Sequence, residues 1–137
     1  LEALIQPQQL QQAQAYPFDI IKGSDPMARI NTLPMWHALL NDLVQGIEPA
    51  MISARFHHTL ARMILDMVSF IAKQHGINTV ALSGGVMQNP TLFTLTRNLL
   101  TEQGLQVLTH RQIPANDGGL AIGQAAIAAA RLQLETN

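Results

Sequence analysis

The chain has 137 residues, of which 47% are apolar and only 12% are charged. This length suits one domain, and the apolar content excludes a disordered chain, which would lack the hydrophobic residues needed to offset chain entropy. The formal net charge is −1 and the eight Lys and Arg residues are scattered, so we do not expect nucleic acid as a partner.

No apolar run approaches the roughly 20 residues that a membrane-spanning helix needs, so no membrane contact is expected. The sequence has no cysteine, which excludes disulfides, a thiolate nucleophile and a Cys-rich zinc site, and agrees with a cytoplasmic location. Because position 1 is Leu rather than Met, we expect the chain to be part of a longer polypeptide.

The amino-terminal part predicts a connector followed by a β-hairpin. Residues 6–14 are rich in Gln and contain Pro7, a composition that favours an exposed connector or a short surface helix. Apolar runs at 18–21 and 28–30 flank residues 22–26, where Gly, Asp and Pro favour a turn.

Two helices should follow this hairpin. The first is predicted to start at Thr32, because Pro34 is tolerated in a first helical turn, and to end at Gly46. The second runs from Pro49 to a left-handed cap at Gly76. Its apolar residues recur at spacings of three and four and predict one buried stripe: Ile52, Phe56, Leu60, Met63, Ile64, Met67 and Ile71.

The remaining sequence predicts two strand–loop–helix units. Strands are expected at 79–82 and 106–109, the first covered on both faces because it lacks polar alternation. Helices should begin at Asn89–Pro90 and at Asn116 or Asp117. Strands alternating with helices predict an α/β fold with a parallel sheet. Small residues should let the last helix approach the sheet or a helix closely: Gly119, Gly123, Ala126 and Ala130.

The loop after the first of these strands is a candidate ligand site, because open α/β sheets bind ligands beyond the carboxyl ends of their strands. Gly84 and Gly85 would let the backbone approach a nucleotide, with hydrogen bonds from Ser83, Asn89 and N–H groups at a helix N-terminus. The residues also fit a purely structural interpretation, a tight turn followed by a helix cap. The loop lacks the x-Asp-Ser continuation of ATP pyrophosphatases, and the chain has no Walker A motif.

The loop after the second strand offers a carboxylate at a helix start. Asp117 is a candidate oxygen ligand for a cation that neutralises phosphate charge, or simply a helix cap. Asn116, Gly118 and Gly119 are further candidate contacts in this loop. His110 is the only histidine in either loop, but no Ser or Cys nucleophile can be paired with it from sequence, so no catalytic residue is assigned.

His57 and His58 are adjacent on the long predicted helix, so their side chains diverge by about 100° and do not form a metal-binding pair. We expect both to be structural or solvated.

Two longer strings carry a family resemblance. VALSGGVMQN at 80–89 and VLTHRQIPANDGGLAIGQA at 107–125 closely resemble the carboxy-terminal end of the HypF carbamoyltransferases of hydrogenase maturation, as do residues 16–18 and 54–61. The resemblance covers nearly the whole chain. Met87, often aromatic in that family, and Ala115, often a second Pro, depart from the pattern.

The resemblance implies that residues 1–137 are the carboxy-terminal subdomain of the carbamoyltransferase domain, half of an actin-like ATPase (RNase H-like) domain similar to the tRNA threonylcarbamoyl transferases. In that family carbamoyl phosphate and ATP give a carbamoyl-adenylate, whose carbamoyl group passes to the carboxy-terminal cysteine of HypE and becomes the cyanide ligand of nickel–iron hydrogenase. Matched by position, Ser83, Gly84, Gly85 and Asn89 would contact the nucleotide, and Asp117 would bind a divalent metal near the phosphates.

Other family features are missing from this sequence: a His-x-x-x-His metal pair, an acylphosphatase-like domain and a Cys-rich zinc region. We therefore expect a half-site that is inactive alone and depends on the remainder of its polypeptide. Two alternatives remain: a non-catalytic docking module, and a fragment of a tRNA threonylcarbamoyl transferase. The lack of a basic surface and the closer match of residues 116–119 to HypF argue against the second.

Overall fold

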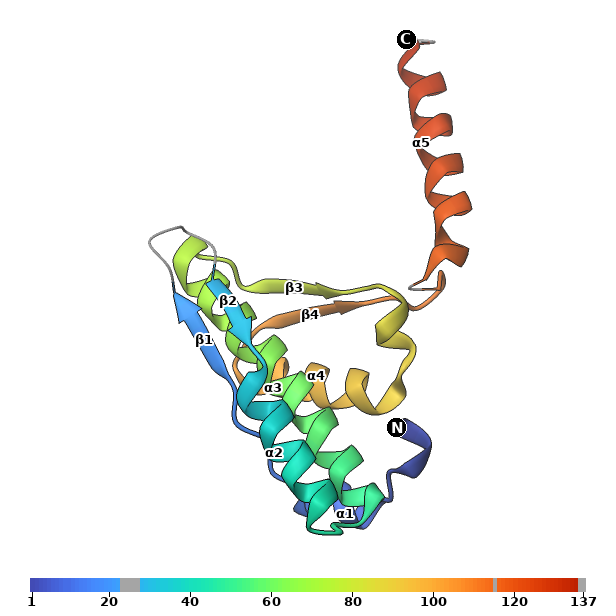
Figure 1. Ribbon diagram of the computed structural model, residues 1–137. Helices are drawn as coiled ribbons and strands as arrows, with labels where there is room; N and C mark the ends of the chain where they lie inside the picture. The colour runs from blue at the N-terminus through green and yellow to red at the C-terminus, as the bar shows by residue number, and fades with distance from the viewer. Residues whose placement is uncertain (23–27, 115, 136–137) are drawn as a thin grey trace.

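The computed structural model describes residues 1–22, 28–114 and 116–135. Its elements, in chain order, are η1 (Glu2–Leu4), α1 (Pro7–Gln12), β1 (Asp19–Lys22), β2 (Ala28–Asn31), α2 (Leu33–Val44), α3 (Pro49–His75), β3 (Thr79–Leu82), η2 (Gly85–Gln88), α4 (Pro90–Glu102), β4 (Gln106–Thr109), η3 (Asp117–Gly119) and α5 (Leu120–Glu135). As Figure 1 shows, α3 runs through the middle of the fold, with α2 and the hairpin on one side and α4 with β3 and β4 on the other.

The long helix α3 is buried on two sides. The predicted apolar stripe packs in part as expected, since Ile52 and Met63 join a core cluster with Tyr16 of the N-terminal segment and Met35 of α2. The single-stripe prediction is nevertheless incomplete. Small and polar residues on other faces of α3 are also buried, where α4 and the N-terminal segment pack against it: Ser53, Ala54, His57, Thr59 and Ala61.

The predicted β-hairpin is confirmed. Strands β1 and β2 pair antiparallel with Ile20 opposite Ile30, while the predicted turn falls largely outside the described residues. The start of α2 differs in one detail, because the Asn31 side chain, rather than that of Thr32, accepts the hydrogen bond from Leu33 N at 3.1 Å. The predicted ends at Gly46 and Gly76 are present, both with positive φ.

The Gln-rich segment is a surface helix rather than a plain connector. It contains α1, which packs against α3. His58 of α3 forms a hydrogen bond at 2.8 Å to the Leu10 carbonyl oxygen, with the ring nitrogen Nε2 donating.

Further along, Tyr16 donates its hydroxyl proton to Asp42 at 2.7 Å, and Arg55 forms an ion pair with the same carboxylate. Burial, reinforced by the Asp42 hydrogen bond and negative charge, raises the pKa of Tyr16 well above its ordinary value. The phenol therefore stays a hydrogen-bond donor and ties the segment to α2.

Strands β3 and β4 form a parallel pair connected through α4, which confirms the α/β prediction. One face of this pair packs on α3 and α4 through Val80, Leu82 and Val107. The expectation that the first strand is covered on both faces is wrong for this chain. On the other face Ala81 is exposed and Leu108 keeps 49% of its surface accessible.

Helix α5 projects away from the rest of the fold (Figure 1). The predicted close approach through its small residues does not occur within the described chain, since a Cβ added at Gly123 would meet nothing within 4 Å. Leu120 and Ile127 are more than half exposed. None of the described helices is long and apolar enough to cross a membrane.

Two buried threonines make a matched stability test. Thr59 Oγ1 accepts from Tyr16 N and donates to the Arg55 carbonyl oxygen, both at 2.7 Å, whereas Thr96 Oγ1 has no hydrogen-bond partner among the described residues. Thr59→Val should lower the free energy of unfolding by about 1–3 kcal/mol, because it strands a buried backbone N–H. Thr96→Val should leave it unchanged or raise it by up to about 1 kcal/mol. Urea denaturation of both variants measures the difference, and equal effects would contradict these hydrogen-bond assignments.

Candidate functional site

The two candidate loops lie at one edge of the sheet, because β3 and β4 are parallel and the loops follow their carboxyl ends. The structure also joins them directly, since His110 Nε2 and Ser83 Oγ are 2.9 Å apart. The sequence alone offered no serine to pair with His110, and the structure places Ser83 beside it. Ser83 and His110 are 27 positions apart in sequence and come together because of the register between β3 and β4, which the local sequence does not reveal.

The glycine loop has a backbone shape that only glycine adopts readily. Gly84 has φ 96° and ψ 160°, a region that disfavours any residue with a Cβ. The 3-10 turn η2 follows, closed by hydrogen bonds from Met87 N to Gly84 O and from Asn89 N to Val86 O. Ser83, Gly84, Gly85 and Val86 are all exposed, so the loop is accessible from solvent.

Asn89 caps α4 as predicted, and both the oxygen and the nitrogen of its side-chain amide have a partner within the chain. Its Oδ1 accepts from Leu92 N at 2.8 Å, and its Nδ2 lies 3.0 Å from His57 Nε2. Glu2 Oε1 accepts from Thr91 N at 3.1 Å. Because Pro has no N–H, the first turn of α4 has no open donor for a ligand among these residues. The backbone N–H groups that were expected to donate to a nucleotide at this helix N-terminus are therefore already engaged within the chain.

An open cavity of about 600 Å³ lies between the two loops and α5. That volume falls within the range of small-molecule and cofactor sites. The glycine loop, His110 and Asp117 give it polar walls, and α5 gives it an apolar wall. Its lining comprises Ser83, Gly84, Gly85, His110, Ile113, Pro114, Asn116, Asp117, Gly119, Leu120, Ile122, Gly123, Gln124, Ala126 and Ile127. The structure thus brings most predicted site residues together, whereas Asn89 and Gly118 do not line this cavity.

The side chain of Asn116 stabilises the Asn116–Gly119 turn, since its Oδ1 accepts a hydrogen bond from Gly118 N at 3.0 Å. Gly119 is required for close packing, because a Cβ there would lie 2.8 Å from the Pro114 carbonyl oxygen. Asp117 is exposed and begins η3. The described residues contain no group of three or more His, Cys, Asp or Glu that could hold a metal, so Asp117 supplies one carboxylate and no complete site.

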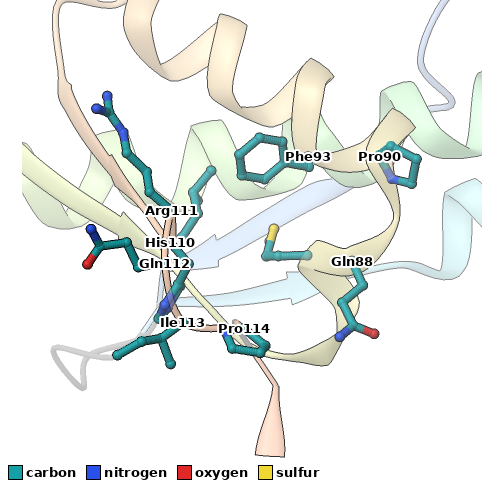
Figure 2. A pocket seen from close by; sticks show the side chains of 10 residues that line it. Gln88, Pro90, Phe93, His110, Arg111, Gln112, Ile113 and Pro114 are labelled. Atoms are coloured by element: carbon teal, nitrogen blue, oxygen red, sulfur yellow. The ribbon is translucent and has the colours of Figure 1, made fainter. Parts of the chain in front are cut away.

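A second open cavity, of about 480 Å³, lies between α4 and residues 110–114, which follow β4. Figure 2 shows Pro90 and Phe93 of α4 on one side and the segment from His110 to Pro114 on the other. Arg111 places a positive charge on its wall. The sequence interpretation missed this cavity, although a basic residue inside a loop that follows a strand was a usable signal.

Comparison with known proteins gives one family. Residues 1–124 match the family described as "Carbamoyltransferase, Kae1-like Domain, second subdomain". The Carbamoyltransferase HypF of Rhodobacter capsulatus is 43% identical over 91 residues, which cover 66% of this chain and 12% of that protein. Carbamoyltransferase HypF2 of Cupriavidus necator is 38% identical over 104 residues, 74% of this chain and 12% of that protein.

Solved structures agree with this assignment. A crystal structure of full-length HypF in the phosphate- and nucleotide-bound form matches 96% of this chain and 17% of its own, with a TM-score of 0.81 and 33% identity. T. kodakarensis HypF matches 88% of this chain and 15% of its own, with a TM-score of 0.67 and 25% identity. The chain therefore spans only a small part of the relatives that it matches, and its fold is half of an actin-like (RNase H-like) domain. It belongs to the HypF carbamoyltransferase family, as the second subdomain of the Kae1-like domain.

Proposed function

We propose that this chain supplies half of the ATP and metal site of a carbamoyltransferase, which uses carbamoyl phosphate and ATP in the cytoplasm to carbamoylate the carboxy-terminal cysteine of HypE. The observation that carries the proposal is the cavity of about 600 Å³ that brings the Ser83–Gly85 loop and Asp117 together at one sheet edge. A related full-length HypF, 33% identical to this chain, was solved in a phosphate- and nucleotide-bound form, which supports the use of a nucleotide by proteins of this family.

The proposed roles follow from the chemistry of each group. Ser83 offers a hydroxyl group, and the glycine backbone allows close approach of a ribose or phosphate. Asp117 would hold a divalent cation by one carboxylate oxygen, because hard cations prefer oxygen ligands. When bound, the cation would neutralise phosphate charge. Asn89 supports the loop from behind rather than touching the nucleotide, because both ends of its amide are engaged elsewhere.

The proposed partner of this half-site is the remainder of the polypeptide. Leu108 on the uncovered sheet face is 49% exposed, and Leu120 and Ile127 on α5 are 61% and 57% exposed. Apolar surface of this extent on the sheet face and on α5 favours burial against further protein. A lone carboxylate also binds a cation weakly, so we expect this chain alone to be inactive.

Calorimetric titration of ATP with Mg²⁺ tests the proposal. The titration should be carried out on this chain and on the whole product of the reading frame that encodes it. We call this whole product the complete polypeptide. We expect measurable binding only by the complete polypeptide, with affinity reduced at least about tenfold by Asp117→Ala, because a cation ligand is lost.

Glu102→Ala, which removes an exposed carboxylate at the far end of α4, is the matched control and should leave binding unchanged. Absence of binding by the complete polypeptide, or an Asp117→Ala variant with wild-type affinity, would contradict the nucleotide role and favour the docking module.

A further inference from the structure

His57 is a buried titratable residue that contacts the end of the glycine loop and does not line the cavity. It lies on α3 with 3% of its surface exposed, below the start of α4. Its Nδ1 lies 2.8 Å from the Ser53 carbonyl oxygen, and its Nε2 lies 3.0 Å from Asn89 Nδ2. Both ring nitrogens therefore have a partner within the chain.

These partners determine the proton positions. A carbonyl oxygen only accepts hydrogen bonds, so Nδ1 carries the proton and donates it to Ser53. Nε2 is then a lone-pair acceptor, and the Asn89 amide group donates to it. The same orientation turns Asn89 Oδ1 toward Leu92 N, which it caps at 2.8 Å. Reversing the Asn89 amide would place its oxygen against the lone pair of His57 Nε2 and its NH2 group against Leu92 N, which would break both hydrogen bonds. The tautomer of His57 that carries its proton on Nδ1 therefore fixes the orientation of the Asn89 amide.

Asn89 is also the downstream end of the glycine loop. It ends η2, and its own N–H donates to Val86 O at 3.1 Å. The upstream end is held by Leu82, which is buried in the core between β3 and α4. The loop from Ser83 to Gln88 is therefore anchored at Leu82 and at Asn89. Among the hydrogen bonds described for Asn89, the one to His57 is the one that connects it to α3.

We propose that His57 is a positioning residue of the nucleotide site: its Nε2 acceptor orients Asn89 and thereby fixes the Ser83–Gln88 loop, without touching the ligand. This inference rests on the function proposed above. Loss of the hydrogen bonds that orient metal ligands typically costs about 10- to 100-fold in metal affinity or activity, and we expect a loss of similar size when the support of this loop is removed.

Two substitutions separate this role from simple core packing. His57→Gln places an amide oxygen near the position of Nε2 and keeps an acceptor for Asn89, whereas His57→Asn keeps a donor near Nδ1 for Ser53 and leaves Asn89 Nδ2 without its partner. In the complete polypeptide, titrated with ATP and Mg²⁺, His57→Gln should bind within about threefold of wild type. His57→Asn should bind at least about tenfold more weakly.

A ligand-free measurement keeps the inference separate from the proposed function. Amide hydrogen exchange at residues 85–88 should be faster in His57→Asn than in wild type and close to wild type in His57→Gln, and Asp117→Ala should leave it unchanged. Equal effects of the two His57 variants on exchange and binding would overturn the positioning role and leave His57 a packing residue. If the wild-type protein fails to bind nucleotide but the exchange difference between the His57 variants persists, the proposed function is overturned. His57 would then stabilise the loop without serving a nucleotide site.

Discussion

Leu100→Ala is expected to lower the free energy of unfolding by about 2–5 kcal/mol, the largest stability change that we predict. Leu100 is fully buried on α4, in a cluster with Leu65 of α3 and Leu82 of β3. Its truncation removes apolar contacts and leaves a cavity where α3, α4 and the sheet meet, so three elements lose support at once. Urea denaturation of this chain alone, monitored by circular dichroism, measures the change.

The control is Leu108→Ala on the uncovered face of the same sheet. Leu108 keeps 49% of its surface accessible, so its truncation should cost less than about 1 kcal/mol. Similar losses in the two variants would show that both faces of β3 and β4 are packed in solution. That result would contradict the one-sided core described here.

Gly84→Ala is expected to have the largest effect at the site. It should lower the free energy of unfolding by about 1–3 kcal/mol, because φ 96° with ψ 160° is essentially restricted to glycine. A Cβ at Gly84 would meet no atom within 4 Å, so the cost comes from the backbone conformation and not from a clash. The loop is expected to adopt another shape, and ATP affinity of the complete polypeptide should fall at least about tenfold.

Gly85→Ala is the matched stability control. Gly85 has no positive φ, and an added Cβ would again meet nothing within 4 Å. Its free energy of unfolding should stay within about 0.5 kcal/mol of wild type. If thermal or urea denaturation shows Gly84→Ala to be as stable as Gly85→Ala, the loop conformation described here is wrong.

Local patterns predicted the elements of this fold because their signals lie within a few residues. Pro49 and Gly76 mark the ends of α3, and Asn89 with Pro90 starts α4, as the structure confirms. The parallel strand pair followed from two short apolar runs separated by a helix. The sequence alone therefore predicts that Ser83 and Asp117 lie beyond the carboxyl ends of neighbouring parallel strands.

Long-range pairings were not predictable, because the partners are far apart in sequence. The burial of Thr59 depends on the Tyr16 backbone 43 residues away, and the link from His57 to Asn89 spans 32 residues. In the sequence, polar residues that such contacts bury cannot be distinguished from polar residues on an exposed helix face. The same reason explains why the His110–Ser83 pair and the cavity beside Arg111 were missed.

The most direct test of a nucleotide site at this sheet edge is hydrogen–deuterium exchange of the complete polypeptide with and without ATP and Mg²⁺. We expect slower exchange on nucleotide addition in two segments of this chain, residues 83–88 and 116–119, with little change in the hairpin strands at 19–22 and 28–31. Slower exchange in neither segment, under conditions where the polypeptide is saturated with nucleotide, would contradict the assignment of the site to this sheet edge.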